Sequence, residues 1–535
     1  MNNKRVILAV ALSLVVLVVW SLLFSPKPPQ KQSQPQEKQA ETPAGEIRPE
    51  LEQAPEQPAA PTLFEAAEGQ KVTVDTPLYR AVFNSQGGVL LKFELKRYKQ
   101  SIAKDSPPVD LIAGNSPSKG PMGLLLNGRA TWRTGEWAAP GKNLELQDGE
   151  TGTLKFTGKA DGVQITRTLS FHADGYLIEE KTRLLNTTES PLPGRLGYTL
   201  AAANLSAEDD RYNLTRISYL NAEGVDDEDD KDDLAKGILR QKELQWGAVQ
   251  SNYFFTALAP ETGDLALKAK YEDNVYRVAV EKQGQELGPG VEKAVDCAYY
   301  LGPVLEERLK ETPNKLSEAV TYGWFDVISK PLLKGLNFFY RYTGHNYGVA
   351  IILLTVSIKI VFWPLSQKSY KSMSKMKKIQ PLMAKIREEH KGDRQKMNQE
   401  MMRLYKTYKV NPAGGCLPIA LQIPVFFGLY QALLGAIELR HAPFITHLPF
   451  TDMIWLADLS AKDPYYVTPL IMGASMFLQQ KMTPSPGDPT QAKIMLFMPI
   501  IFTFLFLNFP SGLVVYWLVN NILSIAQQWL MIRKA

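Results

Sequence analysis

One apolar stretch, residues 346–365, carries a lysine in its interior. About 20 apolar residues suffice for a helix to cross the ~30 Å hydrocarbon core of a bilayer. Lys359 lies roughly 8 Å from the Pro364 end of this stretch, at about 1.5 Å per residue. A cation at this depth is costly and marks a functional site by default. Thr355 shares its helical face, and an ammonium group that snorkels to the nearer interface is the competing interpretation.

The rest of the chain divides by composition. A basic flank followed by an apolar run predicts an uncleaved transmembrane anchor over residues 1–25, with its basic end in the cytoplasm. Residues 26–61, rich in Gln, Pro, Glu and Ala, predict a flexible linker. Short alternating runs with turns such as Gly87-Gly88 predict an all-β sandwich over 62–318. Cys297 and Cys416 then fall on opposite sides of the membrane and are predicted not to pair.

Residues 319–342 carry apolar side chains at helical spacing, with basic residues elsewhere on the helical wheel. The segment contains Pro331 and Gly335 and is too polar to span a bilayer. We therefore predict an amphipathic helix on the outer leaflet. Packing of this helix against the β domain is the alternative.

Residues 366–410 are strongly basic, with two apolar stripes. A turn at 390–393, with Asp393 as N-cap of the second helix, predicts an antiparallel helical hairpin. Pro381 is expected to kink or restart the first helix. The charge places this hairpin in the cytoplasm. It can serve topology and anionic lipid alone, or dock a ribosome or acidic partners; the chain contains no recognisable RNA-binding module, so no direct nucleic-acid partner is predicted.

Four further spans are predicted at 417–437, 465–480, 494–509 and 512–531. The short inner segments carry Lys or Arg, which meets the positive-inside rule. The expected fold is thus a multidomain, multi-pass membrane protein. It combines a five-span α-helical core at 343–535 with the N-terminal anchor and the outer β domain, and both termini are cytoplasmic.

Polar residues on several spans occur at overlapping depths, which predicts a hydrated groove open to the cytoplasm. Its expected residues are Lys359, Thr355, Gln431, Tyr516, Trp517, Asn520, Asn521 and Ser524. Interhelical hydrogen bonding that merely holds a bundle together is the alternative. Thioethers and aromatics adapt to many shapes, so a hydrophobic slide for passing helices is predicted at Met472, Met476, Met495, Met498 and Phe502. Ordinary gap filling in a core is the competing interpretation of these methionines.

No catalytic set emerges from the residues. The five histidines are scattered without metal-ligand spacing, and there is no phosphate-binding glycine loop. Ser357 and Lys359 are near neighbours on one helix and point apart. We predict no enzyme, no metal and no cofactor.

Several blocks of sequence carry a family resemblance: 410–418 (VNPAGGCLP), 438–444 (ELRHAPF), 463–466 (DPYY), 497–499 (FMP) and 508–513 (NFPSGL). With these blocks in this order, the chain resembles the YidC/Oxa membrane protein insertases in their long Gram-negative form. The resemblance implies insertion and folding of bacterial inner-membrane proteins, alone or beside the Sec translocon. It also implies a periplasmic β-supersandwich and a cytoplasmic hairpin needed for activity.

The same resemblance implies roles for single residues. A positive residue in the first core span attracts acidic outer tails of nascent membrane proteins, and Lys359 stands at that position, where many relatives carry Arg. Thr355 matches a groove-lining threonine. Tyr516-Trp517 stands where relatives often show two tyrosines.

Two other classes of function compete with insertion. A secondary transporter or channel could use Lys359 as a substrate or proton site, but it predicts internal repeats, and the sequence shows none. An envelope scaffold would act through its outer sandwich, and deletion of residues 62–310 would abolish its function but spare an insertase core.

Overall fold

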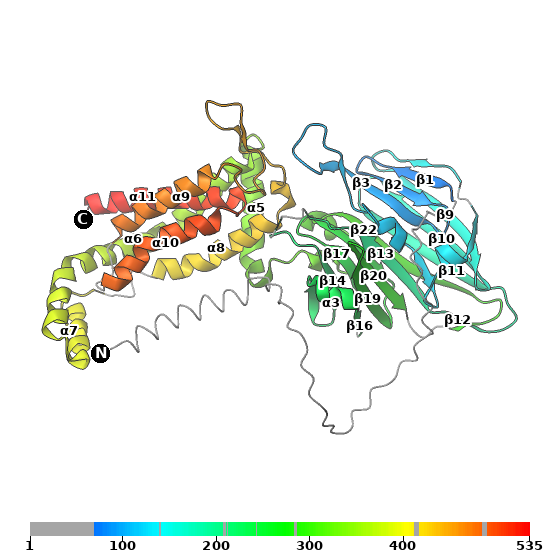
Figure 1. Ribbon diagram of the computed structural model, residues 1–535, viewed down its shortest axis with the longest axis horizontal. Coiled ribbons are helices and arrows are strands. Elements are labelled where there is room, and N and C mark those ends of the chain that lie inside the picture. The colour runs from blue at the N-terminus through cyan, green and yellow to red at the C-terminus, as the bar shows by residue number, and fades with distance from the viewer. Residues whose placement is uncertain are drawn as a thin grey trace, which may run out of the picture. The chain divides into compact units, whose positions relative to one another are not determined.

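The computed structural model describes residues 69–138, 141–206, 210, 212–241, 243–282, 286–410, 417–483 and 489–534. The predicted anchor at 1–25, the linker at 26–61 and Cys416 lie outside the described residues. Figure 1 shows a β-rich part and a helical part.

The β-rich part is built on two large sheets. One has nine strands in the order β15-β14-β17-β18-β22-β11-β10-β9-β7 and is antiparallel throughout. Its strands are β7 (Glu136–Ala138), β9 (Thr151–Ala160), β10 (Val163–His172), β11 (Leu177–Asn186), β14 (Arg216–Asn221), β15 (Gly224–Glu228), β17 (Trp246–Gln250), β18 (Phe254–Pro260) and β22 (Glu292–Pro303). Buried residues alternate with partly exposed ones along β10, as expected when one face of a strand packs on a core.

The second large sheet has six strands in the order β16-β19-β20-β13-β5-β6. They are β5 (Leu124–Leu126), β6 (Arg129–Ala130), β13 (Leu196–Ala202), β16 (Ile238–Arg240), β19 (Leu265–Glu272) and β20 (Val275–Lys282). Strands β13 and β20 contact β17 and β18 of the first sheet. Strands β17 and β18 are buried at every position, because other elements cover both of their faces.

Smaller elements complete this part. A five-stranded sheet has the order β4-β3-β2-β1-β8, with β1 (Lys71–Asp75), β2 (Tyr79–Asn84), β3 (Val89–Lys99), β4 (Pro108–Asp110) and β8 (Leu144–Glu145). Strands β12 (Leu192–Pro193) and β21 (Glu286–Leu287) form a pair. Short helical turns are η1 (Ser116–Lys119), α2 (Thr131–Thr134), α3 (Lys231–Lys236), α4 (Glu306–Leu309), η2 (Leu316–Ala319) and η3 (Gly323–Phe325). The expectation of a β-rich domain is therefore confirmed.

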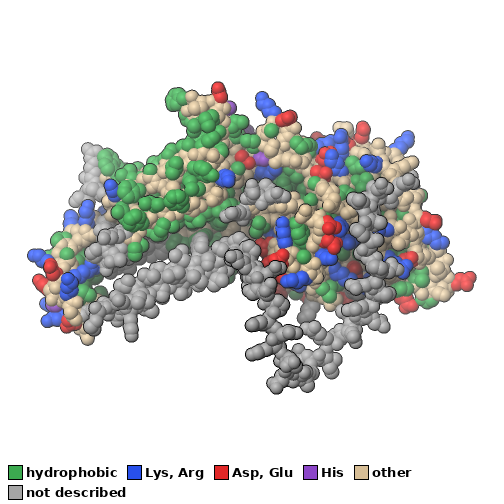
Figure 2. Space-filling view, viewed as in Figure 1, with side chains coloured by type: hydrophobic (Ala, Val, Ile, Leu, Met, Phe, Trp, Pro, Cys, Tyr) green, Lys and Arg blue, Asp and Glu red, His purple; other side chains and the backbone are tan. Residues whose placement is uncertain are grey.

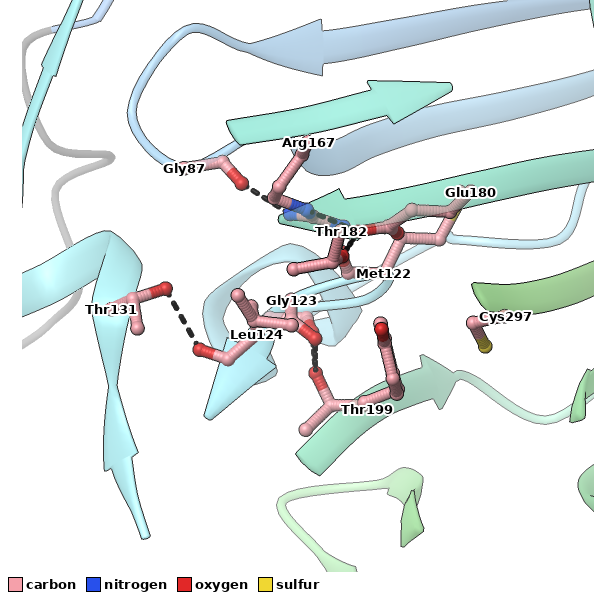
Figure 3. Close-up of polar contacts among 12 residues, drawn as sticks. Gly87, Met122, Gly123, Leu124, Thr131, Arg167, Glu180, Thr182, Thr199 and Cys297 are labelled. Atoms are coloured by element: carbon pink, nitrogen blue, oxygen red, sulfur yellow. Dashed lines mark hydrogen bonds and ion pairs between the residues drawn. The ribbon is translucent and has the colours of Figure 1, made fainter. Parts of the chain in front are cut away.

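A buried ion pair joins the two long strands β10 and β11 to neighbouring loops. Arg167 Nη2 lies 2.7 Å from Glu180 Oε2, and neither side chain is exposed to solvent. Figure 3 shows the guanidinium also directed at the carbonyl of Gly87, and it donates to Met122 O at 2.6 Å. Burial alone opposes the positive charge, but the carboxylate of Glu180 raises the pKa of Arg167 above its ordinary value. The pair therefore fixes the β2–β3 turn and the segment before β5 to the nine-stranded sheet.

The turn that Arg167 holds depends on glycine. Gly87 has φ +72° and Gly88 has φ +66°, a left-handed conformation that residues with a Cβ rarely adopt. A Cβ at Gly87 would also press on Trp132. The turn predicted from Gly87-Gly88 is present.

The helical part contains α5 (Asp326–Tyr342), α6 (Tyr347–Glu389), α7 (Arg394–Thr407), α8 (Leu417–Gly435), η5 (Ile437–Leu439), α9 (Val467–Met482), α10 (Pro489–Phe506) and α11 (Ser511–Lys534), with the hairpin β23 (Ile445–His447) and β24 (Ile454–Leu456). Helix α11 packs against α6 and α9, α9 against α10, and α5 against α6 and α8. Figure 1 shows α6, α9, α10 and α11 lying side by side.

Helix α6 differs from the expected boundaries. We predicted a span at 346–365 and a separate hairpin helix after it, whereas one helix of 43 residues contains both, and neither Pro364 nor Pro381 ends it. Each proline removes one hydrogen bond, but Ile360, one turn before Pro364, is exposed, so the freed carbonyl lies on an open face. At about 1.5 Å per residue the helix is roughly 65 Å long, about twice a bilayer core.

Length and composition alone identify α6 as the helix that can cross a membrane, among the residues that the structure describes. The stretches Leu421–Gly435 in α8 and Ile494–Phe506 in α10 are apolar but shorter. At the tip of the basic hairpin, Asp393 accepts a hydrogen bond from Lys396 N at 3.0 Å and caps α7. This is the N-cap expected from the sequence.

The amphipathic helix α5 packs on other helices. Ser329 Oγ donates to Gly428 O of α8 at 2.8 Å, and Leu333 and Leu336 are buried. Val327 and Tyr342, on the other side, are largely exposed. The main contacts of α5 are with α8, α6 and η3.

Candidate functional site

Helix α11 carries a row of buried polar side chains because it lies between α6 and α9. Asn521, Ser524, Gln527 and Gln528 are all buried. Amide and hydroxyl groups are costly to bury without partners. Ser524 and Asn521 find partners on α6 and α9, whereas the buried Nε2 of Gln527 has no hydrogen-bond partner among the described residues.

Lys359 of α6 faces this row. Its Nζ donates to Ser524 Oγ at 2.7 Å, and Ser524 Oγ donates in turn to Asn520 O at 2.7 Å. The residue is 8% exposed. Within the described ranges no carboxylate forms an ion pair with Lys359. An ammonium group has three donors, so the site holds a buried cation that is solvated by a neutral hydroxyl.

The covered position of Lys359 differs from the expected groove. The sequence predicted a cavity open to the cytoplasm, whereas the ammonium lies within the α6–α11 contact. Thr355, one turn earlier, is also buried, and its hydroxyl donates to Ile351 O of its own helix at 2.6 Å. In this structure the two residues seal the helix contact instead of lining an open cavity.

A second polar link joins α11 to α9. Asn521 Nδ2 donates to Ser475 Oγ at 3.2 Å, and Ser475 Oγ donates to Met472 O at 2.6 Å. Asn521 and Ser524 thus connect α11 to two different helices.

Aromatic rings enclose the first half of α11. Trp517 meets Phe426 of α8 edge-on, with ring centroids 4.5 Å apart, and lies 6.1 Å from Phe502 of α10. Tyr516 is buried, with its ring 6.4 Å from Phe426. Gln431 of α8 is half-buried and forms no hydrogen bond to another described residue through its side chain. The structure thus brings together Lys359, Ser524 and Asn520, but it does not join Gln431 to them.

The predicted slide requires a correction at Met472, which is 0% exposed and belongs to the packed core. The reason is packing on two sides. Met472 lies one turn before Ser475, which contacts Asn521 of α11. The neighbouring Gly473 lets α10 approach so closely that a Cβ there would collide with Thr503 Oγ1. Met476, Met495 and Phe502 are half-buried, and Met498 is exposed.

An exposed apolar surface nevertheless covers α9 and α10. Figure 2 shows hydrophobic side chains spread over the helical part. The exposed large hydrophobic residues on these two helices are mainly leucine, isoleucine and phenylalanine: Leu470, Ile471, Phe477, Leu478, Ile494, Leu496, Phe497, Ile500, Ile501, Phe504 and Leu505.

Replacing Gly473 by valine is expected to separate α9 from α10. The added side chain would meet Thr503, so the helices must shift or the protein must lose stability by about 1–3 kcal/mol, the usual cost of overpacking. The measurement is the thermal unfolding midpoint of the full-length protein in detergent. Combining Gly473→Val with Thr503→Ala should restore part of the loss, and an unchanged midpoint in the single variant would contradict the close contact.

Sequence reasoning missed two buried polar residues of α6 that follow Lys359. Ser366 and Ser369 of α6 are buried, although they follow the apolar stretch and were assigned to the basic hairpin. They lie 7 and 10 residues after Lys359, near two and three helical turns. This spacing was the available signal.

Comparison with known proteins matches both parts of the chain. Residues 71–334 match the family model of the YidC periplasmic domain, and residues 338–535 match that of the 60Kd inner membrane protein. The chain is 54% identical to the membrane protein insertase YidC of Maridesulfovibrio salexigens, over 100% of this chain and 99% of that one. It is 55% identical to the insertase of the same name from Nitratidesulfovibrio vulgaris strain Hildenborough, over the full length of both.

Among solved structures, one titled "Active YidC insertase crystal structure with the first transmembrane domain resolved" is 18% identical. It covers 85% of this chain and 91% of that chain, with a TM-score of 0.36. The chain is more than half identical, over its full length, to proteins named as insertases, and this identity alone is enough to assign its family. It does not support a transporter or channel. The chain belongs to the YidC family of membrane protein insertases.

Proposed function

We propose that this insertase moves client helices into the inner membrane through the α6–α11 contact, without hydrolysing a nucleotide. The observation that carries the proposal is the buried ammonium of Lys359, held by a serine hydroxyl instead of a carboxylate. The bond from the ammonium to Ser524 has one charged partner, whereas a carboxylate would add a second charge and a direct Coulomb attraction in a site of low dielectric constant. An acidic residue of a client can therefore replace Ser524 as the partner.

The topology we propose has five core spans: the first half of α6, then α8, α9, α10 and α11. An N-terminal anchor precedes them, both termini are cytoplasmic, and the β-rich supersandwich is periplasmic. The basic character of residues 366–410 supports the cytoplasmic side of the hairpin. The length of α6 also supports it, since its second half must extend beyond the bilayer.

Parting of α6 from α11 turns the polar row into the groove. The contact contains Lys359, Ser524 and the buried glutamines of α11. Water can hydrate these groups at modest cost because they are polar. Water entering from the cytoplasmic side shortens the apolar distance that a client's polar tail must cross.

Release into lipid follows along the exposed apolar faces of α9 and α10. Burial of a client helix in lipid yields about 25 cal/mol per Å². For an acidic tail, the membrane potential adds about 2.3 kcal/mol per charge per 100 mV. The slide then includes Met476, Met495, Met498 and Phe502, but not Met472.

The partners we propose are nascent membrane proteins, membrane lipids, the Sec translocon and the ribosome. The hairpin of α6 and α7 supports the last of these. It has its own small core of Ile379, Met383 and Val410, so its basic side chains face outward from a folded element. A folded, basic surface suits a large polyanionic partner.

Deleting residues 373–408 is expected to block insertion that is coupled to translation while leaving the membrane core folded. The hairpin core is separate from the large core that joins α6, α9 and α11, so the remaining helices keep their contacts. The measurement is protease protection of a single-span client, synthesised either in the presence of vesicles or before their addition. Unimpaired co-translational insertion would refute the docking role.

Reconstitution tests the proposed function as a whole. Purified full-length protein in liposomes should insert a small single-span client with an acidic tail, without ATP or GTP after synthesis. A fluorescent-solute efflux assay runs in parallel. Solute flux without client insertion would overturn the proposal in favour of a channel.

A further inference from the structure

The β23–β24 hairpin presents an apolar tip to its surroundings. Phe450 is fully exposed, and Met453 and Ile454 are 43% and 54% exposed. Between residues 445 and 456 the chain contains no lysine or arginine, and Asp452 is the single carboxylate. Exposed apolar surface of this kind marks an interaction site.

The tip is ordered. Phe444 N donates to Leu456 O at 2.8 Å, Leu448 N to Met453 O at 2.9 Å, and Thr451 N to Leu448 O at 3.0 Å. Within this turn Phe450 has φ +68°, a conformation that is strained for a residue with a large side chain. Strain of this kind persists where the surroundings impose it and clusters at functional positions.

The base of the hairpin is tied to the first residues of two helices. Asn346, the N-cap of α6, donates to Phe444 O at 3.2 Å, and the ring of Phe444 fills the space beside Gly348. Ser511 N, at the start of α11, donates to Ala461 O at 2.7 Å.

A third helix holds the same base. Trp455 Nε1 donates to Asp463 Oδ1 at 3.0 Å, while Asp463 Oδ2 accepts from Thr468 N in the first turn of α9 at 2.7 Å. Figure 1 shows the loop that joins α8 to α9 extending to the side of the helices instead of continuing along them. The height of the tip is therefore fixed by the outer ends of α6, α9 and α11.

We propose that the β23–β24 hairpin is a lipid anchor that places Phe450, Met453 and Ile454 in the acyl region of the outer leaflet. The inference rests on the topology proposed above, in which these helix ends lie at the outer interface. Lipid is the occupant because Trp455 and Asp463 tie the hairpin to the first turn of α9, where Leu470 and Ile471 expose apolar side chains as the tip does. Without basic residues, the hairpin recognises hydrocarbon and does not select anionic headgroups.

The test measures the depth of the tip in the full-length protein. Met453→Cys is labelled with an environment-sensitive fluorophore in a Cys416→Ser background, since Cys297 is buried and protected. In phosphatidylcholine vesicles we expect blue-shifted emission and quenching by lipids with a shallow nitroxide, several-fold stronger than at Asp148→Cys on the β domain. Phosphatidylglycerol and salt should leave both signals unchanged. Emission equal to that of the Asp148→Cys label would overturn the proposal.

A matched pair of variants distinguishes a label embedded in lipid from a label that the protein itself shields from water. Phe450→Asp should return the Met453→Cys label to water, whereas Phe450→Leu should keep it embedded. Quenching that requires an added client, or disulfide cross-linking of Phe450→Cys between two copies, would overturn lipid as the occupant. If clients are inserted normally but the Met453→Cys label is in water, the lipid anchor is refuted and the proposed function stands. If the label is embedded in lipid but clients are not inserted, the proposed function is refuted and the anchor stands.

Discussion

Replacing Lys359 by alanine should abolish insertion of single-span clients that carry acidic outer tails. A hydrogen bond to a charged group contributes about 1.5–3 kcal/mol, which corresponds to a loss of roughly ten- to a hundredfold in the population of the captured client. The measurement is the fraction of client protected from protease after reconstitution. Normal insertion by Lys359→Ala would refute the role of the charge.

Three controls make this result specific. Lys359→Arg keeps the positive charge and should retain insertion. Ser524→Ala removes the neutral partner but leaves the ammonium available, so it should also retain insertion. A client whose tail contains no acidic residue should respond little to Lys359→Ala, and an equal loss with both clients would indicate damage to the fold.

Replacing Arg167 by alanine should destabilise the β-rich part by about 3–5 kcal/mol, the usual cost of removing one partner from a buried ion pair. Glu180 would remain without solvent exposure and without its cation, and the carbonyls of Gly87 and Met122 would lose their donor. Hydrogen exchange of the β10 and β11 amides in the full-length protein measures this loss as a local opening free energy.

Two further variants isolate the buried charge. Arg183→Ala removes a pair with Glu292 that is more than half exposed on both sides, and exchange should change little. Arg167→Met combined with Glu180→Leu removes both charges and should recover most of the stability. Protection in Arg167→Ala as slow as in the parent would show that the pair does not hold the sheet.

The helices of the core were predictable because they coincide with apolar runs, even where the run is short, as in α8 and α10. The fusion of the first span with the hairpin was not, since hydropathy changes near residue 365 while helix propensity continues. The same applies to the sheets. Arg167 and Glu180 meet only because β10 and β11 pair in a particular register, which local patterns do not determine.

The sequence alone predicted part of the candidate site. A lysine inside an apolar run can be recognised in the sequence as a candidate site residue. In the structure Lys359 donates a hydrogen bond to Ser524. The role of the groove stays a prediction. Met472 was misplaced because a helix face that contacts another helix in a membrane is as apolar as one that contacts lipid. Gly473 beside it was the clue, since small residues let helices approach.

Because helix α6 is uninterrupted, the buried Lys359 and the tip of the basic hairpin at Glu389 belong to one continuous element. Glu389 lies 30 residues beyond Lys359, roughly 45 Å along the axis, so a small tilt at the tip sweeps a long arc. Such a rod bends most readily at a proline, and Pro364 is 5 residues from Lys359. Under the docking role proposed above, a load on the tip would bend the helix at Pro381 or at Pro364, and the second of these lies beside the ammonium group.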